Sequence, residues 1–190
     1  MRKLDRHAAG TVGVSFSEDL AYCLYARDAW GIRTPTASRI PACTSAAVLG
    51  ENGRQATKTG DLGTGWDRWW QATLGAYVGG SGYEARQLGS LPDEFADTDV
   101  RQAFRALYPE AREWVMQSKR EHIQLIQLTH TIRMRTAVLD LRPGDFHIVC
   151  IPVESSFGQL ISPSYALASP VLFGDQPSFL DWLSTVSTAS

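Results

Sequence analysis

Between residues 109 and 141 the hydrophobic positions predict one long helix. Apolar side chains recur at alternating spacings of four and three residues through Leu125, Leu128 and Ile132, as expected for one face of an α-helix. Pro109 fits the first turn, where proline and nearby acidic residues are favoured. At 1.5 Å per residue such a helix spans roughly 45 Å, enough to cross a small domain. We therefore expect Pro109–Leu141 to be the central helix.

The N-terminal part alternates between apolar and small residues and predicts a strand over Thr11–Phe16. Ser17 follows as a helix N-cap, and the acidic residues after it fit a first helical turn. This helix is expected to end near Trp30, because Gly31 suits the left-handed conformation that closes many helices. Its wide apolar face predicts a buried position.

An aromatic-rich helix is predicted to begin at Trp66. Its aromatic and apolar residues share one face at helical spacing, namely Trp66, Trp69, Trp70, Thr73, Leu74 and Tyr77. Three indoles on one face are typical of a core contact, and Arg68 points away from that face. A shorter helix is then predicted to end at Tyr108, with Phe104 and Leu107 directed inward.

The C-terminal part predicts strands. Phe146–Ile151 is almost wholly apolar and rich in β-branched residues, which is typical of a strand covered on both faces. A turn separates it from a second strand at Gln159–Ile161. A third strand is predicted in one of two apolar segments, Tyr165–Leu167 or Val171–Phe173.

Together these elements predict an α+β fold. A small antiparallel sheet, made of the N-terminal strand and the C-terminal hairpin, would pack on the central helix and several shorter helices. A last helix is expected from Asp175 or Ser178, and the length of 190 residues favours a single domain over residues 1–190. Glu51–Gly65 is rich in glycine and predicts a flexible loop, because long loops inside compact domains are commonly functional or mobile.

Composition and charge describe a soluble globular protein with an uneven charge layout. Hydrophobic residues make up 44% of the chain, and the net charge of −2 gives no general attraction to nucleic acid or anionic membranes. Residues 101–142 contain eight Lys and Arg against four Asp and Glu, whereas residues 143–190 contain four acidic residues and no Lys or Arg. The three cysteines form no paired motif, and no segment has the pattern of a signal peptide or membrane span. We therefore expect a cytoplasmic protein without a membrane partner.

The sequence contains no motif that identifies an active site. The glycine-rich segments lack the spacing of a phosphate-binding loop, and no GxSxG segment marks a nucleophilic serine. His147 and Cys150 lie three apart in a predicted strand, which places them on opposite faces. His122 and His130 differ by about 80° around one helix and do not form a ligand pair. We therefore predict no cofactor and no metal site.

Basic residues along the central helix do not form a stripe for nucleic acid. At 100° per residue, Lys119 and Arg120 do not align closely with Arg133 and Arg135. The acidic remainder of the chain would oppose an approaching phosphate backbone. We expect no nucleic-acid partner.

The function that the sequence favours is that of a non-catalytic protein–protein interaction protein. The lack of a site motif, the six tryptophans and the polarised charge indicate this class, and Trp and Arg are frequent in binding hot spots. The candidate partner-binding residues are Trp66, Arg68, Trp69 and Trp70. In class, the predicted domain resembles small bacterial immunity or antitoxin proteins, which inhibit a toxin. That analogy rests on shape and on no motif.

The alternative is a small-molecule-binding protein or an enzyme. Its pocket would lie between the central helix and the sheet, with Glu51–Gly65 as a lid and His122 or His130 as the polar group inside. The glycine-rich loop and the histidines on a mostly apolar helix face indicate this class.

Overall fold

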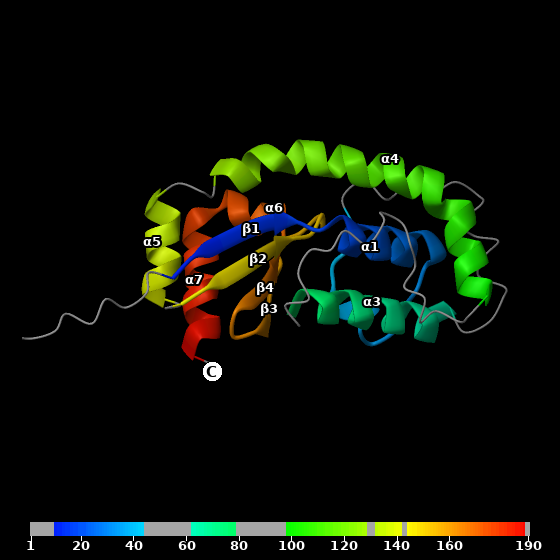
Figure 1. Cartoon of the computed structure of the whole chain (residues 1–190), viewed down its shortest axis with the longest axis horizontal. Helices are drawn as coiled ribbons and strands as arrows, with labels where there is room; N and C mark the ends of the chain where they lie inside the picture. The colour runs from blue at the N-terminus through cyan, green and yellow to red at the C-terminus, as the bar shows by residue number, and fades with distance from the viewer. Residues whose placement is uncertain (1–9, 44–61, 79–97, 129–131, 142–143, 189–190) are drawn as a thin grey trace, which may run out of the picture.

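The protein has an α+β fold, in which a four-stranded sheet adjoins a group of helices (Figure 1). The computed structural model describes residues 10–43, 62–78, 98–128, 132–141 and 144–188. The predicted fold class is confirmed. In chain order the elements are β1 (Val12–Phe16), α1 (Glu18–Trp30), η1 (Ala37–Arg39), α3 (Leu62–Val78), α4 (Thr98–Leu128), α5 (Ile132–Leu141), β2 (Phe146–Cys150), β3 (Gly158–Ser162), β4 (Tyr165–Ala168), α6 (Pro170–Gly174) and α7 (Gln176–Thr188).

The sheet is mixed, which corrects the prediction of an antiparallel sheet. Its strand order is β1-β2-β4-β3; β1, β2 and β4 run parallel, and only β3 is antiparallel to its neighbour β4. Between β1 and β2 the chain passes through several helices and returns along the same direction, and between β2 and β4 the strand β3 reverses the chain, so β4 again runs parallel to β2. The alternation of apolar and polar residues along a strand does not show whether the strand runs parallel or antiparallel to its neighbours. Of the two segments predicted for the third strand, Tyr165–Leu167 forms β4 and Val171–Phe173 lies in α6.

The caps of α1 lie where the sequence predicted them. The Ser17 hydroxyl accepts a hydrogen bond from the Leu20 backbone N–H at 3.1 Å, which satisfies one of the free donors of the first turn. Gly31 closes the helix at φ 65°, a left-handed conformation that suits glycine. Most of α1 is buried, as expected. The helix α7 likewise starts after a capping residue, because the Asp175 carboxylate accepts a hydrogen bond from the Ser178 backbone N–H at 3.4 Å and a second from the Ser178 hydroxyl at 2.6 Å.

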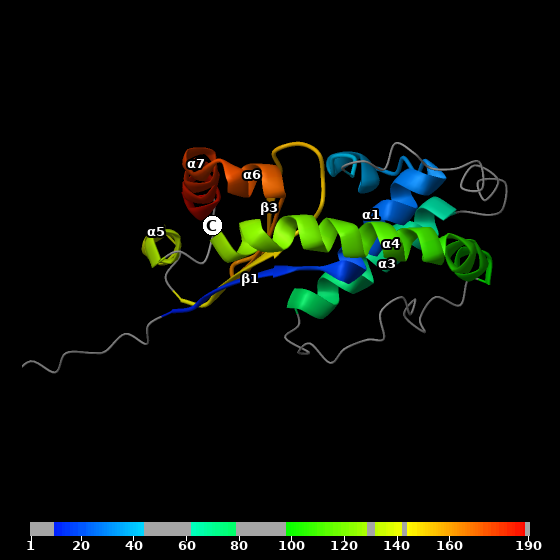
Figure 2. The ribbon, with the colours of Figure 1, turned by 90° about the horizontal axis from the view of Figure 1, so that it is seen from above.

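The predicted long central helix is confirmed, but its predicted bounds, Pro109–Leu141, are wrong in two respects. The helix α4 begins at Thr98, so Pro109 lies inside it, and a separate helix α5 starts at Ile132. Pro109 is exposed, whereas Ala111 and Val115 are buried, so the missing N–H of the proline affects the solvent side while the buried face stays packed. The N-terminal part of α4 turns away from the rest, and α5 points in another direction (Figures 1 and 2).

Two hydrophobic clusters divide the interior. The helical cluster joins α1, α3 and α4 to the near side of β2 and β4, and includes Leu20, Leu24, Tyr25, Trp66, Trp69, Trp70, Phe104, Leu107, Val115, Val149, Ile151 and Leu167. The sheet cluster joins the opposite sheet face to α5, α6 and α7, and includes Val12, Val138, Phe146, Ile148, Cys150, Ala166, Ala168, Leu172, Phe173, Phe179 and Leu183. Figure 2 shows α6 and α7 on one side of the sheet, with α1 and α3 beyond the ends of its strands. Among the described residues, no helix is long and apolar enough to cross a membrane.

The predicted loop Glu51–Gly65 is wrong at its end. Leu62–Gly65 forms the first turn of α3, where Leu62 and Gly65 are buried, and the remainder of the predicted loop lies outside the described residues. The early start of α3 adds Leu62 to the helical cluster. Burial of that apolar side chain stabilises the turn despite the low helix propensity of glycine.

Candidate functional site

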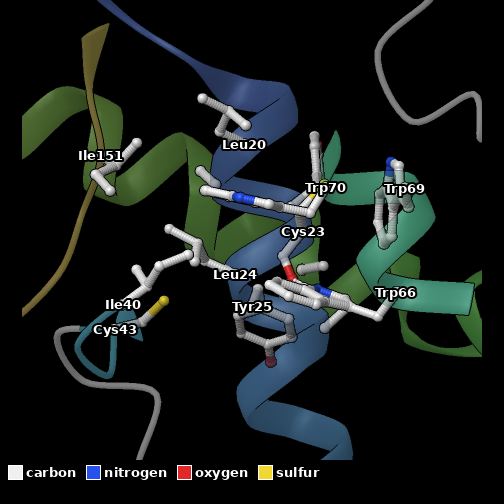
Figure 3. Packing of buried hydrophobic residues seen from close by; sticks show 14 of the residues in the cluster. Leu20, Cys23, Leu24, Tyr25, Ile40, Cys43, Trp66, Trp69, Trp70 and Ile151 are labelled. Atoms are coloured by element: carbon white, nitrogen blue, oxygen red, sulfur yellow. Dashed lines mark hydrogen bonds between the residues drawn. The ribbon is translucent and has the colours of Figure 1, made fainter. Parts of the chain in front are cut away.

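The three tryptophans predicted to bind a partner are core residues. Trp66, Trp69 and Trp70 are 0%, 4% and 2% exposed. Trp66 and Trp70 extend from α3 toward α1 in Figure 3, and the Trp69 ring packs edge-on against Phe104 of α4 at 4.8 Å. The Trp66 and Trp70 rings stack at 5.6 Å, and the Trp66 indole N–H donates to the Cys23 carbonyl at 2.6 Å. Their helical spacing places all three on the buried stripe, so none offers an exposed indole to a partner. Arg68 is exposed, and partner contact there stays a prediction.

The two histidines of the predicted pocket are not seen together. His130 lies outside the described residues, while His122 is half-buried on α4. The His122 Nδ1–H donates to the Ser118 carbonyl at 2.7 Å, because a carbonyl oxygen only accepts. One turn away Lys119 forms an ion pair with Glu18, which ties α4 to the first turn of α1. A pocket between α4 and the sheet stays a prediction.

A buried arginine that sequence reasoning missed has a structural role. Arg27 is 2% exposed and donates to the carboxylate of Asp28 at 2.6 Å and to the carbonyls of Ile40 at 2.8 Å and Pro41 at 2.7 Å. Asp28 also accepts from the Cys43 N–H at 2.7 Å. Burial, together with the nearby Asp28 carboxylate, raises the pKa of the Cys43 thiol. With the charge paired and the carbonyls satisfied, this network holds the segment after α1 in place.

A polar pair on the sheet is the strongest candidate for chemistry. The register of β1 and β2 sets Gly13 opposite His147, and the Ser15 hydroxyl lies 2.9 Å from His147 Nε2. The ring of Tyr165 in β4 lies 5.6 Å from the imidazole ring, centroid to centroid. All three side chains are half-buried, whereas Val149 on the same face is buried under the helical cluster. We call Ser15, His147 and Tyr165 the polar face of the sheet.

Glycine at position 13 makes room for this imidazole. A Cβ atom added at Gly13 would lie 2.4 Å from His147 Nδ1, closer than such atoms approach. The imidazole ring therefore lies over the bare backbone of β1, where it reaches Ser15. Burial lowers the pKa of His147, so the ring is neutral at pH 7 and either donates to or accepts from the serine.

An acidic residue links the beginnings of β1 and β2. Asp145 accepts from the Thr11 backbone N–H at 2.9 Å and from the Thr11 hydroxyl at 2.7 Å. These bonds favour the charged carboxylate and lower the pKa of Asp145. The contact lies at the beginning of the strand pair whose register brings Ser15 to His147.

The pairing of Ser15 with His147 was not predictable from sequence. Both residues lie in strands that the pattern predicts, and those strands were expected to share a sheet. Register and direction between segments so far apart depend on the helices that intervene. The only available signal was that Ser15 and His147 are polar positions inside otherwise apolar strands.

The outer edge of β3 is the second notable surface. Among the described residues β3 pairs with β4 alone, and a bulge interrupts the pair near Leu160. The Ser169 backbone N–H donates to the Phe157 carbonyl at 2.8 Å. Because antiparallel ladders alternate, the N–H and C=O groups of Gly158 and Leu160 are then directed to the outer edge. The Trp182 ring covers one face of β3 at Gly158, where an added Cβ would lie 2.4 Å from it.

The sequence segment that contains β3 is acidic, and one of its acidic residues, Asp145, lies beside β1 at the opposite edge of the sheet. Residues 144–188 contain no Lys or Arg, and their four acidic side chains, Asp145, Glu154, Asp175 and Asp181, are all exposed. The strand β3 itself has no charged residue.

Metal ligands do not cluster in the described part of the chain, where no group of three or more His, Cys, Asp or Glu side chains lies together. Comparison with protein-family models, curated proteins and solved structures found no match to this chain.

Proposed function

We propose that this protein acts by binding another protein, and that the outer edge of β3 is the contact surface. An extended segment of the partner would add to the sheet as a further strand, bound by main-chain hydrogen bonds. The single observation that supports this most directly is an uncharged edge strand that pairs on one side alone among the described residues. Edge strands that bind no partner are commonly blocked by charged side chains, proline, bulges or short length; β3 has a bulge near Leu160 but no charged side chain.

The two edges of the sheet differ in this respect. The helix α4 packs against β1 and runs beside it in Figure 1, so that edge is covered. At β3 the backbone groups of Gly158 and Leu160 are directed outward, and the partly buried side chains of Phe157 and Ile161 lie nearby. A partner strand would satisfy these backbone groups and cover apolar surface.

Charge favours a basic partner. Glu154 lies in the chain shortly before β3, and Asp181 adjoins Trp182, which packs on β3 at Gly158. The potential of these exposed carboxylates attracts Lys and Arg and repels acidic segments. We therefore commit to an extended segment of another protein, rich in Lys or Arg, as the occupant. A bacterial, cytoplasmic inhibitor of the immunity or antitoxin type is the specific form that the sequence favours, and it stays a prediction.

The test uses a synthetic, fluorescein-labelled peptide of about nine residues that alternates lysine with valine, long enough for one strand. We expect fluorescence anisotropy to show binding to the full-length protein. A peptide with glutamate in place of lysine should bind at least about tenfold more weakly, corresponding to 1.4 kcal/mol. Gln159 is exposed on β3, so Gln159→Lys should weaken binding of the lysine peptide and Gln159→Glu should strengthen it.

Two matched variants locate the contact. Leu160→Pro removes a backbone donor from the outer edge and should abolish binding, whereas Ser156→Lys adds a charge in the exposed loop before β3 and should reduce binding less than Gln159→Lys does. Equal binding by the wild type, Gln159→Lys and Leu160→Pro would contradict the proposal. A dimer in native mass spectrometry that Leu160→Pro abolishes would show a second copy of this chain as the occupant and would also contradict it.

A further inference from the structure

The Ser15–His147 pair offers chemistry that a binding edge does not need. We propose that Ser15 is a nucleophile activated by His147, and that the polar face of the sheet accepts a small activated ester. This inference goes beyond protein binding at β3 and rests on a different strand pair.

The geometry is that of a nucleophile with its base. The distance of 2.9 Å from Ser15 Oγ to His147 Nε2 is within hydrogen-bond reach, and a neutral ring can accept the hydroxyl proton. When Nε2 is the acceptor, the ring proton sits on Nδ1. Burial keeps the imidazole neutral at pH 7, which is the state that a general base requires.

The surroundings hold the imidazole in place. Gly13 lies under the ring and Tyr165 lies beside it, so packing from β1 and β4 limits the positions that the ring can take. This packing orients the ring sterically, whereas in a Ser-His-Asp triad a carboxylate orients it by accepting the Nδ1–H.

Access distinguishes this pair from a buried structural hydrogen bond. Ser15, His147 and Tyr165 each retain partial exposure. Ser17, two residues after Ser15, is buried, caps α1 and contacts the Tyr77 hydroxyl at 2.6 Å. One serine therefore serves the fold, while the other lies half-exposed beside a neutral imidazole.

The proposed reaction balances without a further reagent besides water. Ser15 Oγ bonds to the acyl carbon and its proton passes to His147 Nε2; the ester C–O bond breaks, and the leaving alkoxide takes that proton. Water then attacks the acyl-serine, His147 accepts a proton from the water, and the proton returns to Ser15 as the carboxylic acid departs. The products are one acid and one alcohol.

The test uses a fluorophosphonate, which phosphonylates activated serines, and p-nitrophenyl acetate. We expect intact-mass spectrometry of the full-length protein to show one adduct, which peptide mapping assigns to Ser15. Ser15→Ala should abolish it. His147→Gln keeps a hydrogen-bonding group but removes the base, so labelling and acetate release should fall at least about tenfold, since general-base catalysis contributes about a hundredfold or more.

Two further variants separate chemistry from folding. Ser156→Ala removes an exposed serine remote from His147 and should leave labelling unchanged. Ser15→Cys keeps a small side chain, and its thiol should react with iodoacetamide faster than the same variant carrying His147→Gln. The proposal would be overturned if the fluorophosphonate labelled several exposed serines. It would also be overturned if the rate of labelling at Ser15 were the same in the wild type and in His147→Gln. Neither result bears on peptide binding at β3.

Discussion

The two edge strands of the sheet, β1 and β3, each have one side whose backbone groups pair with no further strand among the described residues, and the surroundings of these two sides differ. At β1 the unpaired side lies against α4, which occupies the place that a further strand would take. At β3 no described element pairs with the outer side; the strand is bulged and a tryptophan packs over one of its faces. An edge covered by a helix is part of the core, whereas an uncharged edge left at the surface is available to a partner. This difference between the edges is why we propose β3, and not β1, as the contact surface.

The largest loss of stability is expected from a substitution on the buried face of α4, the helix that covers β1. Val115 is 0% exposed on the buried face of this helix, so Val115→Asp places an unpaired charge in the helical cluster. An uncompensated buried charge costs about 3–5 kcal/mol, and we expect that loss in the free energy of unfolding. Urea denaturation measures it. Met116→Asp is the matched control, because Met116 is 39% exposed on the same helix and should shift stability by about 0.5 kcal/mol or less.

A smaller loss of stability is expected from a substitution in the edge strand β3. Gly158→Ala would bring a Cβ atom to 2.4 Å from the Trp182 ring, so the indole must move away from β3. Overpacking of this kind costs about 1–3 kcal/mol, and thermal unfolding should detect it. Gly174→Ala is the control, since an added Cβ there meets no atom within 4 Å. Equal stability of the two variants would show that Trp182 does not hold this face of β3.

The smallest change in stability is expected from protonation of His147, which lies in the inner strand β2. Burial lowers its pKa below the ordinary 6.5. The groups that face it are Ser15 on β1 and Tyr165 on β4, and Asp145 lies two residues earlier, just before β2. As the pH falls, the unfolded chain takes up the proton first, so protonation favours unfolding and stability decreases below about pH 6.5. Urea unfolding at about pH 7.5 and pH 5.5 should show a greater loss for the wild type than for His147→Gln. An equal loss in both proteins would mean that His147 does not contribute.

Local signals in the sequence predicted the elements, and the contacts between them were not predictable. Ser17 and Gly31 cap α1 as expected, because caps depend on neighbouring residues only. The start of α4 was predicted wrongly because proline is frequent in the first turn of a helix. In the structure Pro109 lies inside α4, where packing of the buried face continues the helix past it. The strand directions and the approach of Ser15 to His147 depend on long connections that no local pattern records.

The bend of α4 has a consequence for how the molecule opens. Its N-terminal part supplies Phe104 and Leu107 to the helical cluster, while the helix also packs on β1 and on α6, which belongs to the sheet cluster. Neither cluster therefore opens fully unless α4 detaches from both. Amide hydrogens in α1 and in β2 would then exchange with solvent as one cooperative unit, at a rate set by the release of this shared helix.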